Sequence, residues 1–204
     1  MTPEQRRDIV NALLLAQLVA KKALPAPKNL DELSTWYDRY YEVLANIGFV
    51  IQETEFRHYE DEGKGFEGHE AVLEVAATFF GGAAPAALTV LKSVLAALSK
   101  VGDKQPWITL FNRESHSAGA ARFQVSAVDL AGDGTLVMLG SFGLEATDDL
   151  TQVLFFKLHS NQVKIRYNAS KVSINAQVLE AVRDQIAKKL AGIASEYIEG
   201  LPDL

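Results

Sequence analysis

Apolar side chains recur at every third or fourth position in residues 1–48, which is the spacing of an amphipathic helix. The run Thr2–Gln5 begins a helix with a capping hydroxyl, a proline at the first helical position and a glutamine that can reach back to the cap amide. Pro25 ends this helix, a second one begins near residues 29–31, and Gly48 ends it. Residues 1–48 are therefore predicted to form an antiparallel helical hairpin.

Alternating apolar and polar residues, the pattern of β-strands, replace the helical spacing in two other parts of the chain. Residues 49–59 are predicted to form a strand near the edge of a sheet. Turn-like sequences divide residues 106–174 into further runs, and such short connections predict an antiparallel meander. These runs are 107–112, 122–129, 134–144, 151–159 and 162–174, the last as two adjoining pieces, 162–170 and 171–174.

Two of the predicted strands are apolar on both sides, which indicates that both faces of the sheet are covered. Gln152–Phe156 is the more continuous of the two and is expected in the middle of the sheet. In residues 134–144 the side chains form two sets that point to opposite faces, Leu136, Met138 and Phe142 in one and Val137 and Leu139 in the other.

Residues 69–101 form the least polar part of the chain, with no charged residue between Glu74 and Lys92. Gly81-Gly82 and Pro85 divide this part into two short helices, which predicts a second helical hairpin. Continuous apolarity favours a hairpin that is buried against the sheet. A second interpretation is that the same hairpin can leave the sheet and meet lipid, and the two are compatible in a protein that changes state.

A last amphipathic helix is predicted at residues 175–200 and can supply further cover for the sheet. The 204 residues, 48% of them apolar, are enough for one domain with a normal core, which we expect to span residues 1–204. The predicted fold is α+β. It is a single-domain, three-layer α/β/α sandwich in which helical hairpins cover a central, mostly antiparallel sheet.

Composition excludes several classes of function. A net charge of −6 with interspersed acidic and basic residues leaves no basic stripe for phosphates, so we expect no nucleic-acid partner. Cysteine is absent, so neither disulfides nor thiolate chemistry are available. The apolar run at residues 9–20 is interrupted by polar residues, and no stretch of about 20 uninterrupted apolar residues exists. We expect a protein made in soluble form, without a signal peptide.

No residue pattern for catalysis or for a cofactor is convincing. His58, His69 and the acidic residues between and beside them lack the close spacing of a metal site, and a solvated acidic loop is the simpler interpretation. Ser115-His116-Ser117 is not a nucleophile elbow, because neighbouring residues of an extended chain point to opposite sides. Gly132-Asp133-Gly134 is a hairpin turn without the features of a phosphate loop. The chain is expected to be no enzyme and to need no cofactor or metal.

The sheet half of the chain resembles the Cyt δ-endotoxins, a family of single-domain bacterial cytolysins. The resemblance covers Trp107–Ile174, about a third of the chain, and Gln152–Phe156 is its most specific piece. Upstream, Ala12–Leu24 resembles the first helix of the family and Ala71–Val75 the start of its second hairpin. The chain differs in beginning almost at the first helix, so the extension through which many such protoxins dimerise is not expected, and its last helix is longer.

This resemblance implies a toxin that binds membrane phospholipids, self-associates on the membrane and permeabilises it, acting extracellularly at the target cell with haemolytic or insecticidal effect. It implies that helices swing off the sheet, with hinges expected at Gly81, Gly82 and Gly102. The expected membrane-interacting residues are Val75, Phe79, Phe80, Leu88, Val90, Leu91, Val94, Leu95, Val153, Leu154, Phe155 and Phe156.

Two alternatives remain open. The first is a non-lytic binding or assembly protein on the same scaffold, in which the hairpin stays buried and a partner meets an exposed surface at Arg39–Tyr41 or the acidic loop. The second is a small hydrolase that uses His116.

Overall fold

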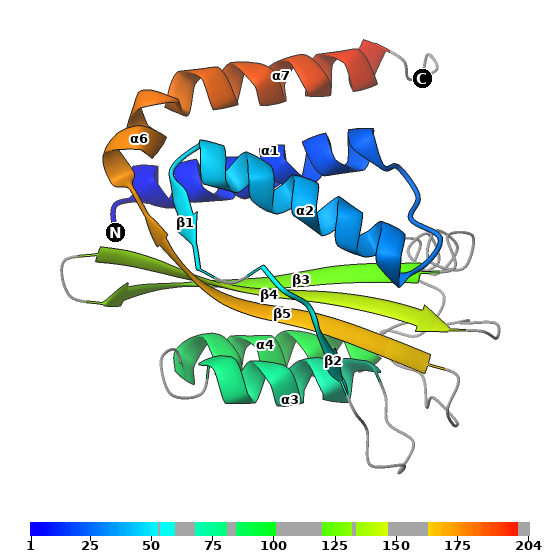
Figure 1. Ribbon diagram of the computed structural model, residues 1–204. Coiled ribbons are helices and arrows are strands. Elements are labelled where there is room, and N and C mark those ends of the chain that lie inside the picture. The colour runs from blue at the N-terminus through cyan, green and yellow to red at the C-terminus, as the bar shows by residue number, and fades with distance from the viewer. Residues whose placement is uncertain are drawn as a thin grey trace.

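An antiparallel sheet lies at the centre of the computed structural model, which describes residues 1–52, 54–59, 68–80, 85–100, 120–131, 134–146 and 163–199 (Figure 1). Within these residues the sheet has five strands in the order β1-β5-β4-β3, and β2 also pairs with β5. The strands are β1 (Phe49–Ile51), β2 (Arg57–Tyr59), β3 (Ala120–Ala131), β4 (Gly134–Ala146) and β5 (Val163–Ile174). The mixed α+β composition expected from the sequence is confirmed.

Strand β4 is covered on both faces, as its sequence predicts. Val137 and Leu139 pack in a core with the first two helices, whereas Phe142 packs in a separate apolar cluster with the second hairpin. Met138, on the same side as Phe142, is also completely buried. The pairing partners of β4 are β3 and β5 along almost its whole length, so β4 is a central strand.

Helices α1 (Pro3–Ala23) and α2 (Leu30–Asn46) lie on one face of the sheet (Figure 1). The predicted capping box is present, because the Thr2 hydroxyl accepts from the Gln5 amide while the Gln5 side chain accepts from the Thr2 amide. Asn29 caps α2. Gly48, with a φ of 104°, follows the end of α2 in a conformation that favours glycine and leads directly into β1.

Helices α3 (Gly68–Phe80) and α4 (Pro85–Lys100) cover the opposite face (Figure 1). Their division agrees with the break predicted at Gly81-Gly82 and Pro85. The two helices contact each other, and α3 contacts β4. The sheet therefore separates two helical hairpins.

The C-terminal segment differs from its prediction in two ways. It forms α6 (Ala176–Ala181) and α7 (Arg183–Glu199), because Val182 has a φ of −102° and a ψ of 3° and interrupts the helix. It also packs on α1, on the side of α1 that faces away from the sheet (Figure 1). The guanidinium of Arg183 fixes this position by donating to both carboxylate oxygens of the buried Asp8 at 2.7 to 2.9 Å.

The single strand predicted at residues 49–59 is wrong in its middle. Of this stretch, β1 and β2 pair with β5, whereas Gln52 and residues 54–56 lie outside the strands. There Phe56 turns to the ring of Tyr37, 4.8 Å away between centroids, and the Glu55 carbonyl accepts a 2.9 Å hydrogen bond from Asn168 Nδ2. The strands predicted at 107–112 and 151–159 lie outside the described residues.

Candidate membrane-interacting hairpin

The α3–α4 hairpin docks on the sheet through an apolar cluster. Val72 and Val75 of α3 and Leu95 of α4 pack with Phe142 of β4. Val75 and Leu95, both expected to interact with membrane, are 8% and 6% exposed. Burial of such a side chain contributes about 1.5–3 kcal/mol, because it removes apolar surface from water. Apolar burial therefore contributes to holding the inner face of the hairpin on the sheet.

Other candidate residues of the hairpin lie at different depths. Phe79, Leu88 and Leu91 are partly buried. Val90 is 63% exposed, so continuous apolarity in α4 does not bury this side chain. Phe80 and Val94 belong to α3 and α4, but their side chains lie outside what the structure describes, as do all of Gly81, Gly82, Gly102, Val153, Leu154, Phe155 and Phe156.

Buried hydrogen bonds hold the opposite face of the sheet to α2. The Tyr37 hydroxyl donates to the carbonyl oxygen of Phe142 at 3.0 Å. The Tyr41 hydroxyl lies 2.8 Å from Ser141 Oγ and 3.1 Å from Asn168 Oδ1. Ser141 and Asn168 are themselves only 1% and 2% exposed. Removal of α2 would take the two tyrosine hydroxyls away from these sheet oxygens, and each lost hydrogen bond that is not replaced costs about 1–3 kcal/mol for a group that stays dry.

Polar contacts also link the first turn of α2 to the sheet. The amide of Leu30 donates to Glu145 Oε2 at 2.8 Å, and Arg166 Nη1 donates to Asp31 Oδ1 at 2.9 Å. Both contacts join residues more than a hundred positions apart. They fix the start of α2 above the end of β4.

Aromatic rings fill the space between α2 and the sheet. Trp36 stacks on Tyr40 at 5.7 Å between ring centroids, and Tyr37 stacks on Tyr41 at 6.2 Å. Burial raises the pKa of Tyr37, Tyr40 and Tyr41 well above the ordinary value, because the interior disfavours the phenolate. These hydroxyls therefore stay protonated where an exposed tyrosine ionises.

The hypothesis of an exposed partner surface at Arg39–Tyr41 is wrong for its two tyrosines. Tyr40 and Tyr41 are 2% and 3% exposed, whereas Arg39 is exposed and pairs with Glu42 at 2.7 Å. Helical spacing places both tyrosines on the face of α2 that meets the sheet. The sequence-based hypothesis extended the exposure of Arg39 to the two tyrosines that follow it.

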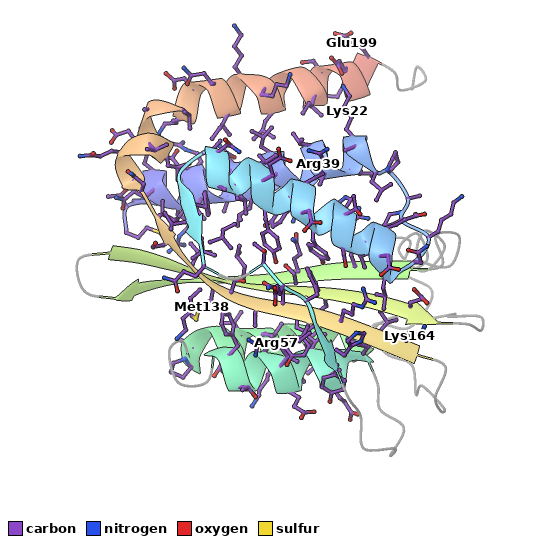
Figure 2. The ribbon with its side chains drawn as sticks, viewed as in Figure 1. Lys22, Arg39, Arg57, Met138, Lys164 and Glu199 are labelled. Carbon is purple, nitrogen blue, oxygen red and sulfur yellow. The ribbon has the colours of Figure 1, made fainter. Side chains whose placement is uncertain are left out.

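A cavity of about 420 Å³ lies at the seam between the hairpin and the sheet. Beside it the hydroxyl of Tyr59, on β2, donates to the carboxylate of Glu74, on α3. Figure 2 shows Arg57 and Met138 on this side of the sheet. No sequence motif predicted the cavity, because its lining comes from three separate parts of the chain, namely Gln52, Arg57, Tyr59, Glu74, Val75, Thr78, Phe79, Tyr167, Ala169 and Lys171.

The histidine and acidic residues that could bind a metal form no such site where the structure describes them. Among the described residues, no three histidine or acidic side chains come together in a way that could hold a metal ion. His58 and Glu70 are exposed. The other members of the acidic loop, residues 60–67, and the triplet Ser115-His116-Ser117 lie outside the described residues.

A search of the described helices finds none that combines the length and the apolar character needed to cross a membrane. Neither the models of known protein families nor the curated proteins match this chain.

Proposed function

We propose that the chain is a Cyt-like cytolysin that binds phospholipid membranes, oligomerises on them and permeabilises them. In this proposal the fold is a three-layer α/β/α sandwich, and α3–α4 is the layer that leaves the sheet. The observation that carries the proposal is the apolar docking of this hairpin, through Val75, Leu95 and their neighbours, onto Phe142.

Apolar docking can be exchanged for lipid at modest net cost. A valine or leucine that leaves the sheet for acyl chains remains out of water, so the hydrophobic contribution of about 1.5–3 kcal/mol per side chain is largely kept. The outer side of α4 adds the exposed Val90. Because residues 75–91 carry no charge, no charged group from this stretch has to enter the acyl region.

The α1–α2 layer is poorly suited to the same exchange. The hydroxyls of Tyr37 and Tyr41 would lose their partners on β4 and β5, and acyl chains offer no replacement. The proposal therefore assigns α1–α2 to the part that stays on the sheet. Strands exposed by the departing hairpin could enter a bilayer only after pairing in a closed oligomer, because unpaired backbone groups are too costly there.

The alternative is a non-lytic binding or assembly protein on the same scaffold, in which α3–α4 stays docked. The bond between Tyr59 and Glu74, which joins β2 to α3, favours a hairpin that remains in place. Leakage of dye from liposomes separates the two functions. A protein that releases no dye at micromolar concentration, before or after limited proteolysis, is the non-lytic one.

A tether provides the sharper test. Gln52 and Thr78 are exposed and line the same cavity, one from the sheet side and one from α3. The chain has no cysteine, so Gln52→Cys with Thr78→Cys supplies the sole pair of thiols for a reducible bis-maleimide. The cross-linked protein is expected to keep its fold and lose leakage, and reduction of the linker should restore it.

The matched control tethers the other layer. Asp31 and Arg166 join α2 to β5 at 2.9 Å, so Asp31→Cys with Arg166→Cys places the same linker on the α1–α2 side. This tether should leave leakage unchanged. Loss of leakage in the control alone, or persistence in the α3 tether, would contradict the assignment of the moving layer.

A further inference from the structure

The cavity between α3 and the sheet has one apolar wall and one cationic wall. Val75 and Phe79 give it an apolar wall on α3, while Arg57 and Lys171 bring two cations from the sheet. Glu74 is the carboxylate in the lining. The two cations give the sheet wall of the cavity charged donors for an anionic group.

The strand register brings both cations to the same side. Tyr167, Ala169 and Lys171 alternate along β5 and all line the cavity, as side chains two positions apart share a face. Arg57 is the β2 partner of Tyr167. The Glu74 carboxylate already accepts the Tyr59 hydroxyl. Within the described residues Lys171 has no ion pair.

We propose that this cavity binds a small free organic acid. Its anionic group faces Arg57 and Lys171, and its apolar body lies against Val75 and Phe79. A volume of about 420 Å³ falls in the range of ligand pockets. Because α3 supplies one wall and the sheet the other, the ligand binds only the docked hairpin and stabilises it. The proposed binding site does not depend on membrane activity. That a bound acid would also inhibit leakage, by keeping the hairpin docked, rests on the proposed function.

Thermal unfolding of the full chain with three probes of equal length tests the anion preference. Octanoate should raise the melting temperature in a saturable way. Octanamide, which is neutral, and octylammonium, which is cationic, should have little effect. A similar rise with all three probes, or none with octanoate, would overturn the site.

Substitutions locate the binding. Arg57→Gln and Lys171→Gln should each lower the affinity for octanoate about tenfold or more, because a charge-assisted hydrogen bond is lost. The control is Lys164→Gln, a change of the same kind at a β5 lysine that pairs with Glu145 at 3.8 Å on the α2 side. An equal loss in the control would mean that octanoate binds elsewhere or without a defined site.

Hydrogen exchange tests the docked-state preference without a membrane readout. Octanoate should slow amide exchange in residues 68–80 of the wild type and not of Lys171→Gln. A raised melting temperature with unchanged exchange there would overturn the link to the hairpin. If phosphatidylglycerol vesicles slow this exchange and octanoate does not, the anion is a lipid headgroup and the proposed free acid is wrong. Failure of these tests leaves the tether experiment on leakage unaffected.

Discussion

The two hairpins cover the same sheet by different means. On one face, α2 places the hydroxyls of Tyr37 and Tyr41 against buried oxygens of β4 and β5. On the other, α3 and α4 place Val75 and Leu95 against Phe142. Hydrogen bonds depend on direction, whereas apolar contacts depend on little more than shape. One face is therefore suited to a fixed position, and the other to an exchange of partners.

A core that is hydrogen-bonded on one face of the sheet and apolar on the other gives the two hairpins different costs of leaving the sheet. A buried hydroxyl network costs free energy when it is left half satisfied, so α1–α2 has one stable place on the sheet. The apolar cluster under α3–α4 carries no such penalty when lipid replaces the sheet. In the proposed function, a ligand in the cavity between α3 and the sheet would hold the hairpin in its docked position.

The largest expected effect is a loss of folding stability at alkaline pH, caused by the buried tyrosines of α2. Tyr37, Tyr40 and Tyr41 have a folded pKa raised by burial, so above about pH 10 the unfolded chain loses protons that the folded chain keeps. Stability is then complete below the unfolded pKa and falls as pH rises towards the folded values. Each tyrosine costs about 1.4 kcal/mol per pH unit, which gives about 4 kcal/mol at pH 11.

Urea unfolding at pH 8 and pH 11, followed by tyrosinate absorbance, measures this loss. Tyr40→Phe is the matched variant, because it removes one of the three ionisable groups and should reduce the alkaline loss by about 1.4 kcal/mol. Equal stability of the wild type at both pH values would show that the tyrosines ionise without unfolding, and the fixed face would lose its defining property.

Truncation of one buried leucine on each side of the sheet compares the packing of the two faces directly. Leu33 of α2 is 1% exposed and Leu95 of α4 is 6% exposed. Leu33→Ala should cost about 3 kcal/mol, because the hydrogen-bonded surroundings cannot collapse into the gap, and Leu95→Ala about 2 kcal/mol. Only Leu95→Ala should also speed dye release, since it loosens the layer proposed to move. Faster release by Leu33→Ala would reverse the roles of the hairpins.

Local signals in the sequence specified the helices well. The capping box at Thr2 and the cap at Asn29 each involve neighbours within a few positions, and Gly48 is itself a helix-end signal, so the first hairpin could be predicted. The alternation in β4 likewise follows from its own side chains.

What the sequence did not predict depends on contacts between distant residues. The interruption between β1 and β2 requires Asn168 to reach the Glu55 carbonyl, 113 positions away. The place of α7 depends on the pair Asp8 and Arg183, 175 positions apart. The seam cavity likewise has no local motif, and it is the part of the candidate site that pattern alone could not supply.

A glycine tests how closely the fixed face is packed. A Cβ at Gly143 of β4 would lie 2.5 Å from Leu33 Cδ2 and 3.1 Å from Leu30 Cδ2, so α2 approaches the strand where no side chain intervenes. Gly143→Ala should cost about 2 kcal/mol, because the leucines must move in a filled core. In the control, Gly192→Ala, the new methyl meets nothing within 4 Å, and helix propensity should stabilise α7 by up to about 1 kcal/mol. A neutral Gly143→Ala would indicate that α2 can shift on the sheet.

The smallest effect on stability is expected at the outer surface of α3–α4, the layer that is proposed to leave the sheet. Val90 of α4 and Val10 of α1 are 63% and 55% exposed, so Val90→Asp and Val10→Asp should each change unfolding free energy by less than about 0.5 kcal/mol. Their effects on leakage should differ. An aspartate at the centre of a membrane-inserted helix costs about 2.5–3.5 kcal/mol, so Val90→Asp should slow dye release at least tenfold, while Val10→Asp should not. Equal leakage from both variants would mean that the outer side of α4 does not enter the acyl region, and the contrast between the two faces would then describe packing alone.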